Sequence, residues 1–420
     1  MKKVKYLVLG GGVTGLAFAN FIDSDDYLVI EKENKFGGYC KTIKKNGFVW
    51  DYAGHFFHFA NEEIKSFFAN KIDSSEIIQR EKITNIYIEN NHIDFPFQKN
   101  IHQLEKDSFI YCLYHLFNRI EKKKYVSFED MLYGKFGKGI TELFLKPYNE
   151  KLYACSLDTL DVDAMGRFFP YADIKEIINN MIVSQNDSYN SKFLYPRGGA
   201  ETFVNALLSD LDERKLWNDC SVVSIDVENK IVSTHNGKVE YQYLINTIPL
   251  NQFVELVNID TNGKESLSCN KVLVLNIGFD GNSPVNSHWT YFPEDEYVFY
   301  RVGFYNNILD NEKRMSLYVE IGLKEDENVD LSFYLDRTLE DLKKAGIIIN
   351  HNVVAYEFLV LNPAYVHVSK NSESFKALFK EKLVKSDIYT LGRYGDWKYC
   401  SIEDNISESL SLSKELNGYK

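Results

Sequence analysis

Three glycines and one acid near the N-terminus have the types and spacing of a dinucleotide-binding turn. The segment reads Val4-Lys-Tyr-Leu-Val-Leu-Gly10-Gly-Gly12-Val-Thr-Gly15, and Glu31 follows the second apolar run. Gly10 allows a tight turn, Gly12 lets backbone N–H groups approach a pyrophosphate, and Gly15 lets a helix pack closely on a strand. The Glu31 carboxylate can accept hydrogen bonds from a ribose diol. We therefore predict a strand–helix–strand unit whose helix N-terminus faces phosphate groups.

Further glycine turns favour FAD over NAD as the dinucleotide. Gly37-Gly38 follows the second strand, and Gly392-Arg393 follows a short apolar run near the C-terminus. A third turn, Gly198-Gly199, opens an apolar segment with helical periodicity. Arg393 could place a guanidinium fork on phosphate oxygens. The longer FAD molecule needs more contact points than NAD, so separated glycine turns fit it better.

Composition limits the classes of partner. The chain has 420 residues, is 45% hydrophobic and carries a net charge of −12. It is long enough for two or three interleaved domains, and its acidity argues against nucleic acid or an anionic membrane as partner. Six scattered cysteines without a CxxC pair indicate a reducing cytoplasm, no disulfide framework and no metal site. The first strand begins at once, so we expect no signal peptide and no membrane insertion.

The order of the predicted elements indicates an α/β fold with insertions. Helices and strands alternate at both ends of the chain, whereas the middle reads as a helical block followed by an antiparallel sheet. We expect a hairpin over 83–93 with its turn at Asn90-Asn91, and a helical block interrupted at Pro147 and Pro170. The predicted domains are a Rossmann-like FAD-binding domain (1–80, 190–250 and 385–420), a helical substrate or lid domain (100–189), and an antiparallel sheet substrate domain (81–99 and 251–384).

Four further segments carry a resemblance to a known family. They are Trp50-Asp-Tyr-Ala-Gly54-His55-Phe-Phe-His58, Phe95-Pro-Phe-Gln98, Lys146-Pro-Tyr-Asn149-Glu-Lys and Gly392-Arg-Tyr-Gly-Asp-Trp-Lys-Tyr399. Together they resemble the UDP-galactopyranose mutase family, nearest its eukaryotic-type branch, within the amine-oxidase-like FAD superfamily. The resemblance runs from Val4 to the final helical segment.

The resemblance implies roles for individual residues. His55 would lie beside the flavin, Arg167 and Arg301 would bind the substrate diphosphate, and these three would form the catalytic set. The residues implied to bind substrate are Phe97, Gln98, Asn149, Tyr153, Arg167, Tyr291, Arg301, Tyr365 and Tyr399. Spacing alone leaves open a core histidine at His55, surface ion pairs at the arginines and packing roles for the tyrosines. Both arginines lie in apolar runs, where a buried charge would need an anionic partner.

The family resemblance also implies a reaction. Reduced FAD would attack the anomeric carbon of a UDP- or dTDP-linked sugar through N5, and pyranose and furanose forms would interconvert for cell-surface polysaccharide synthesis. NADPH or NADH could serve as the reductant, and a homo-oligomer is left open. The family has a tryptophan where this chain has Tyr153, so the lid and the sugar preference do not follow from the resemblance.

Two other functions fit part of the pattern. A FAD-dependent amine oxidase or desaturase would share the glycine turns but would not explain arginines within apolar segments. A nucleotide-binding protein without catalysis would bind FAD and show no turnover.

Overall fold

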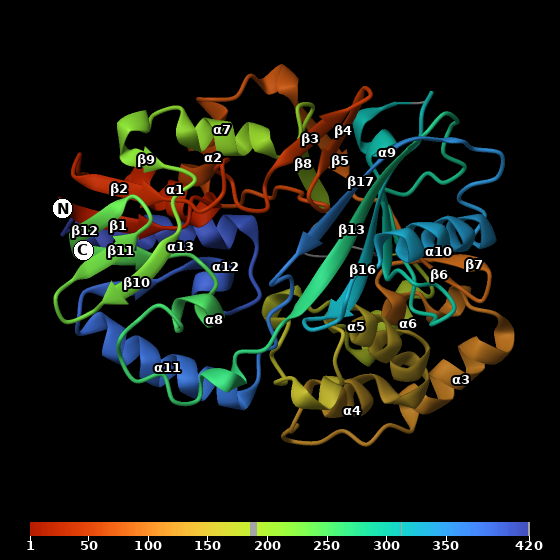
Figure 1. Ribbon diagram of the computed structural model, residues 1–420. Helices are drawn as coiled ribbons and strands as arrows, with labels where there is room; N and C mark the ends of the chain where they lie inside the picture. The colour runs from red at the N-terminus through yellow and green to blue at the C-terminus, as the bar shows by residue number, and fades with distance from the viewer. Residues whose placement is uncertain (185–190, 312, 419–420) are drawn as a thin grey trace.

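The first sheet is built around the N-terminal strand. The structure is a computed structural model that describes residues 1–184, 191–311 and 313–418. In this sheet β1 pairs in parallel with both β2 and β12, as the dinucleotide pattern predicts (Figure 1). The strand order is β10 (Val222–Asp226), β11 (Ile231–Thr234), β12 (Gly237–Asn246), β1 (Lys2–Leu9), β2 (Tyr27–Ile30) and β9 (Leu216–Trp217), with β18 (Ile388–Thr390) pairing with β12.

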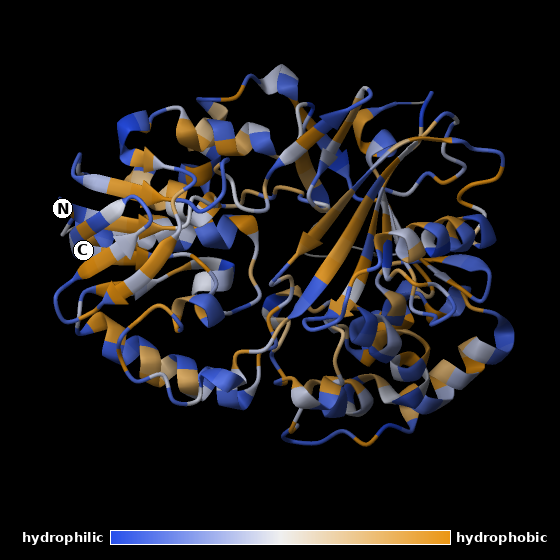
Figure 2. Cartoon of the chain, in the orientation of Figure 1, coloured by the Kyte–Doolittle hydropathy of each residue, from blue (hydrophilic) through white to orange (hydrophobic). Residues whose placement is uncertain are grey.

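Helices cover both faces of this sheet, so its strands are apolar on both sides. Tyr6 and Val8 of β1 pack with helices on one face, and Leu7 and Leu9 pack with helices on the other. The orange strands on the left of Figure 2 show this continuous apolar character. The helices on the first face are α1 (Val13–Phe21), α2 (Glu62–Ala69), α7 (Glu201–Leu208) and α13 (Ile402–Leu416), and those on the second are α8 (Leu250–Phe253) and α11 (Lys370–Val384).

The position of α11 corrects one predicted domain boundary. We expected residues 251–384 to belong to the antiparallel sheet domain, but Phe375, Phe379 and Leu383 of α11 pack with residues of the first sheet. An amphipathic pattern shows that a helix buries one face and does not say which sheet it covers. The predicted boundary at 189–190 lies outside the described residues.

The second sheet is antiparallel except for one pair. Its order is β17 (Val353–Leu361), β13 (Asn270–Phe279), β16 (Ser316–Lys324), β15 (Arg301–Phe304), β14 (Trp289–Tyr291), β6 (Thr84–Ile88) and β7 (Asn91–Asp94). Only β14 and β6 run parallel. The predicted hairpin is present, but Glu89 and Asn90 are the residues with positive φ at its turn, one position earlier than expected. Helix α10 (Leu331–Lys344) covers one face of the sheet.

The predicted helical block covers the other face of the second sheet. It contains α3 (Lys106–Phe117), α4 (Phe128–Ile140), the π-helical turn η4 (Thr141–Leu145), α5 (Lys146–Tyr153), η5 (Leu157–Thr159), η6 (Gly166–Phe168) and α6 (Ile174–Asn180). Pro147 does not interrupt the block as we expected, because it lies in the first turn of α5, where a missing N–H costs little.

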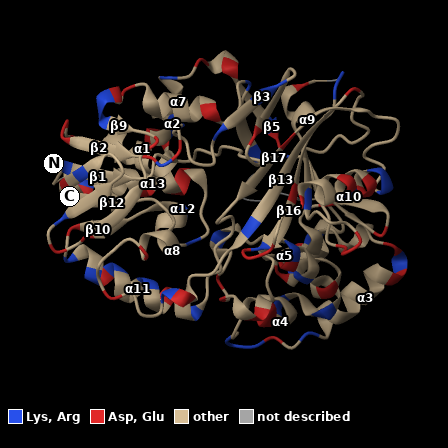
Figure 3. Cartoon of the chain, viewed as in Figure 1, with Lys and Arg blue, Asp and Glu red and all other residues tan. Residues whose placement is uncertain are grey.

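The remaining elements are short. Two-stranded sheets form from β3 (Thr42–Lys45) with β4 (Phe48–Asp51) and from β5 (Ile77–Glu81) with β8 (Lys192–Pro196). The short helical segments are η1 (Ser74–Glu76), η2 (Phe97–Lys99), η3 (Ile101–Gln103), η7 (Glu213–Lys215), η8 (Lys264–Ser266), α9 (Tyr305–Leu309) and α12 (Gly392–Gly395). Charges of both signs lie along α11 (Figure 3), and no described helix has the length and apolar character needed to span a bilayer.

Helix α5 lies against β16 through a close backbone approach, and one of its lysines is hydrogen-bonded to the loop that follows β14. A Cβ atom at Gly322 would lie 2.0 Å from the backbone oxygen of Lys151. The Lys151 ammonium donates to the backbone oxygens of Phe292, Glu294 and Tyr297 at 2.8–3.0 Å. These contacts fix the helix that carries Asn149.

We predict that Gly322→Ala lowers the free energy of unfolding by about 1–3 kcal/mol, because α5 must shift to admit the new methyl group. Urea denaturation measures this change. Lys324→Ala, at the exposed end of the same strand, is the control and should change stability by less than about 0.5 kcal/mol. Wild-type stability of Gly322→Ala would contradict the close approach.

Candidate functional site

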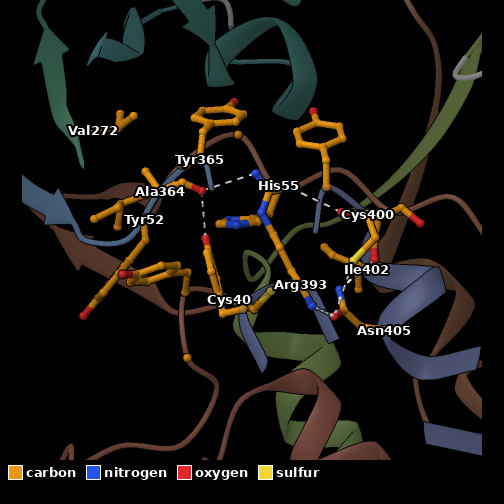
Figure 4. Close-up of a pocket in the computed structure, with 18 of the residues that line it drawn as sticks. Cys40, Tyr52, His55, Val272, Ala364, Tyr365, Arg393, Cys400, Ile402 and Asn405 are labelled. Atoms are coloured by element: carbon orange, nitrogen blue, oxygen red, sulfur yellow. Dashed lines mark hydrogen bonds between the residues drawn. The ribbon is translucent and has the colours of Figure 1, made fainter. Parts of the chain in front are cut away.

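One cavity of about 1380 Å³ runs from the glycine turns to the helical block. Its wall includes residues of both sheets and of the block, and Figure 4 shows the part around His55 and Arg393. Cavities that hold one small ligand usually measure about 300–1,000 Å³. The volume therefore suffices for a dinucleotide together with a second ligand.

The glycine turns form a cradle without side chains at one end of the cavity. Gly12 and Gly37 form a backbone bridge, and a Cβ on Gly12 would lie 3.8 Å from the Cα of Gly38. Helix α1 begins at Gly12 with no side-chain cap, so its first N–H groups are free to face a ligand. Gly15 does not line the cavity. A Cβ atom at this position would lie 2.1 Å from the Gly10 oxygen, so the helix and the turn pack too closely here for any side chain. This contact is the close packing that the sequence predicts.

Glu31 lines the cavity where β2 ends. Its carboxylate accepts hydrogen bonds from the backbone N–H groups of Gly11 at 2.8 Å and Glu33 at 2.9 Å. These bonds hold the acid beside the cradle and leave lone pairs for a diol. The donors and acceptors at this end of the cavity fit the pyrophosphate and ribose of a dinucleotide.

A buried carboxylate fixes the loop that carries His55. Asp51 accepts hydrogen bonds from the Thr42 hydroxyl at 2.7 Å, the Tyr195 hydroxyl at 2.8 Å and the Ala200 N–H at 2.9 Å. Its backbone N–H donates to the Tyr305 hydroxyl, and its backbone oxygen accepts from the Asn276 amide. The loop from Tyr52 to His58 therefore begins next to a residue that is hydrogen-bonded to the start of α7, which packs on the first sheet, and to β13 of the second sheet.

His55 is a neutral, buried group of the cavity wall. Burial lowers the pKa of His55 to about 4, with nearby Glu320, Arg393 and Arg301 as further influences. The imidazole is therefore uncharged at neutral pH. Its Nδ1 atom is buried and has no hydrogen-bond partner among the described residues, so it can bond to a ligand.

Three arginines reach the cavity, and they differ in their partners. Arg301 is buried and bonds through Nε to the Glu320 carboxylate at 2.5 Å. Arg167 bonds to Asp404 at 2.6 Å and is half exposed, which corrects our expectation that it is buried in an apolar run. Each of the two has a carboxylate as its anionic partner.

Arg393 has carbonyl oxygens and aromatic rings around it. Its guanidinium donates to the backbone oxygens of Ala364 and Cys400, each at 3.3 Å (Figure 4). It also lies 4.5 Å from the ring centroid of Tyr399 and 5.2 Å from that of Tyr365. Across the described ranges no carboxylate pairs with it, so its charge is left for a ligand to balance.

Several predicted substrate residues meet opposite the glycine cradle. Tyr365 and Tyr399 stack with ring centroids 5.9 Å apart, and the Tyr291 hydroxyl accepts from the Trp289 indole at 2.8 Å. The Asn149 amide nitrogen donates to the Leu145 oxygen, which leaves the buried Oδ1 atom without a partner in the described structure. All of these predicted residues line the cavity.

Besides Gly15, four predicted residues do not line the cavity. Phe97 and Gln98 begin the η2 turn, which directs them inward: Phe97 stacks on Phe144 and Gln98 donates to the Pro170 oxygen. Tyr153 is buried behind Tyr365, with their rings edge to face at 5.7 Å. Gly392 is turned away by its positive φ, and its N–H donates to Glu408.

Other residues of the cavity wall were not predicted from the sequence. Glu320 is one acid within a buried apolar strand, which is itself a signal for an internal ion pair. Tyr148 precedes Asn149 in the Pro-Tyr-Asn motif and stacks on Phe144 with centroids 5.2 Å apart. Other wall residues that we did not predict are Phe95, Pro96, Lys99, Phe168, Trp289, Tyr300 and Asn405.

Comparisons with known proteins agree with this architecture. A family model described as an NAD(P)-binding Rossmann-like domain matches residues 8–70. A crystal structure of reduced UDP-galactopyranose mutase superposes with a TM-score of 0.93 at 22% identity, covering 100% of this chain and 95% of that chain. The chain shares the fold of that mutase. The predicted fold class, a Rossmann-like domain with an antiparallel sheet domain and a helical insertion, is confirmed.

Oxidases share this fold at greater distance. A structure named for protoporphyrinogen oxidase from Exiguobacterium sp. 255-15 gives a TM-score of 0.78 at 16% identity, covering 100% of this chain and 99% of that one. A redesigned putrescine oxidase gives 0.67 at 11% identity, with 99% of each chain covered. The fold is therefore common to the mutase and to these oxidases, and the choice between them depends on the cavity.

We predict that Asp51 makes stability fall as pH rises from about 4 to 6. Burial raises the pKa of this carboxyl to about 6, although its three hydrogen bonds act in the opposite direction. Between the unfolded pKa near 4 and the folded value, the folded state binds more protons, so ionisation on raising the pH costs about 3 kcal/mol at most.

Asp51→Asn isolates this effect, because the amide oxygen can still accept from Thr42 and Ala200 while the NH₂ group donates to Tyr195. The variant minus wild-type difference in unfolding free energy should grow from pH 4 to 6 and stay constant above. Buried histidines titrate in the same range but cancel in the difference. A difference that does not change with pH would show that the carboxyl is not responsible.

Proposed function

We propose that this chain is a flavin-dependent isomerase that interconverts the pyranose and furanose forms of a nucleotide sugar, UDP-galactose or a related UDP- or dTDP-linked sugar. The observation that carries the proposal is the cavity wall opposite the glycine cradle. Three arginines, several tyrosines and one buried asparagine converge there in a chain of net charge −12. Such a wall suits a diphosphate, whereas an oxidase acting on an apolar amine would need an apolar tunnel.

The glycine cradle fits FAD as the cofactor. The N-terminus of α1 and the turns at Gly12 and Gly37 would hold its pyrophosphate, and Glu31 would bind the adenosine ribose. Reduced FAD, once bound, would supply the nucleophile for the anomeric carbon. NADPH or NADH as reductant is part of the same proposal.

The protein itself would supply charge and orientation. Arg301 and Arg167 would stabilise the negative charge that develops on the departing diphosphate. The hydroxyl groups of Tyr365 and Tyr399 and the Oδ1 atom of Asn149 would keep the released nucleotide near the sugar until it is recaptured. His55, uncharged at neutral pH, would contribute a hydrogen bond and no charge.

A dithionite-reduced assay with UDP-galactofuranose tests the proposal. UDP-galactopyranose that forms only with reduced protein would support the isomerase. No conversion, with UDP still changing the flavin spectrum, would indicate a different sugar nucleotide. No response to UDP, together with amine-dependent oxygen uptake, would favour the oxidase and overturn the proposal.

We predict that the paired replacement Arg301→Gln with Glu320→Gln lowers kcat by about 10²–10³-fold and retains bound FAD. Both charges are removed together because a single change would leave a buried charge without its partner. Turnover of the reduced protein and the flavin absorbance are the measurements.

The control removes another ion pair of the same net charge, Lys344→Gln with Glu296→Gln, on the surface of the second sheet. This control should keep wild-type turnover. If the Arg301 and Glu320 double variant also turns over at the wild-type rate, Arg301 has no role in the reaction.

A further inference from the structure

The helical block meets helix α13 directly at the cavity. Arg167 of η6 donates through Nη2 to Asp404 Oδ1 at 2.6 Å. Beside this pair, the ring of Phe168 lies edge-on to Tyr399, with centroids 5.1 Å apart and an interplanar angle of 76°. Arg167, Phe168 and Tyr399 all line the cavity, so this contact joins two walls of the site.

The two ends of this contact differ in rigidity. Asp404 is the third residue of α13, and its Oδ2 atom accepts from the Ser401 N–H at 2.8 Å and hydroxyl at 2.9 Å in a capping box. Arg167 lies in a short turn after Gly166, which has a positive φ and open space around it. The anion is therefore fixed by its helix, whereas the cation lies at the end of a half-exposed side chain in a short turn.

We infer that Asp404 is a positioning residue that competes with the ligand for Arg167. Its carboxylate takes the guanidinium in the absence of ligand, and a nucleoside diphosphate enters by exchanging with it. The inference rests on the proposed function, since it takes a diphosphate as the ligand. A phosphate group matches the guanidinium fork better than one carboxylate oxygen does, so exchange favours the ligand.

A ligand can displace Asp404 from Arg167 only if the ion pair between these two side chains is weak. The Arg167 side chain is 50% exposed and that of Asp404 is 26% exposed, so water screens the pair. Removing the competing carboxylate should therefore tighten binding by a small factor, roughly twofold to fivefold. It also removes a negative charge that a bound diphosphate would face.

Asp404→Asn in the flavin-loaded protein tests this inference, with UDP as the probe and isothermal titration as the measurement. We expect the Kd for UDP to fall roughly twofold to fivefold, and Asp404→Glu to restore the wild-type value. In an Arg167→Ala background, adding Asp404→Asn should tighten binding less than it does in the wild-type background, because the competition for Arg167 is gone and only the repulsion between the carboxylate and the diphosphate is left to remove. Ser401→Ala, which weakens the same helix cap and keeps the carboxylate, should not tighten binding.

A measurement without UDP separates this inference from the proposed function. Trypsin should cleave after Arg167 faster in Asp404→Asn than in the wild type, because the turn has lost its tie to α13. If the wild type does not bind UDP, the proposed ligand is wrong and cleavage still reports on the tie. Unchanged cleavage with unchanged or weaker UDP binding in Asp404→Asn would overturn the inference.

Discussion

The buried carboxylate of Asp51 joins segments that lie far apart in the sequence. Thr42 and Tyr195 donate to it from two small sheets, Ala200 donates from the start of α7, and Asn276 of the second sheet bonds to the same residue. A full carboxylate in this place is costly unless each oxygen is hydrogen-bonded. Because these bonds come from the start of α7, which packs on the first sheet, and from β13 of the second sheet, they connect the two sheets that contribute to the cavity wall.

The three arginines of the cavity differ in how far neighbouring residues neutralise their positive charge. Arg301 is paired and mostly buried, Arg167 is paired and half exposed, and Arg393 has carbonyl and aromatic neighbours. An ion pair that water reaches can exchange its partner at little cost, whereas a buried pair is held. The three arginine side chains therefore have three different surroundings within one cavity.

Sequence reasoning succeeds here where local geometry decides the structure. The positions of Gly10, Gly12 and Gly15 follow from backbone sterics within one turn, and the first βαβ unit forms where they predict it. The predicted hairpin and the predicted helical block are also present. The burial of Phe97 and Gln98 depends on how the η2 turn meets the helical block, which no local pattern records.

Contacts between distant segments account for the rest of what was not predicted. The assignment of α11 to the first sheet, and the partners Glu320 and Asp404 of the two arginines, all depend on tertiary packing. A lone acid in an apolar strand signals an internal ion pair but does not identify the partner. The residues of the cavity wall that could be predicted are those within a motif, such as His55 and Asn149.

The order of strands in the first sheet has a consequence for biosynthesis. The last residues of β12, from Leu244 to Asn246, lie between β1 and β18, and helix α13 packs on α1. A ribosome releases residues 2–9 and 237–246 long before residues 388–416. Until that last stretch emerges, the end of β12 has no partner strand on the edge that β18 later fills and part of the apolar face of α1 is uncovered, so the nascent chain exposes apolar surface and unpaired strand groups. The cofactor cradle can close only after this stretch has emerged, which makes late synthesis the stage at which a chaperone would matter most.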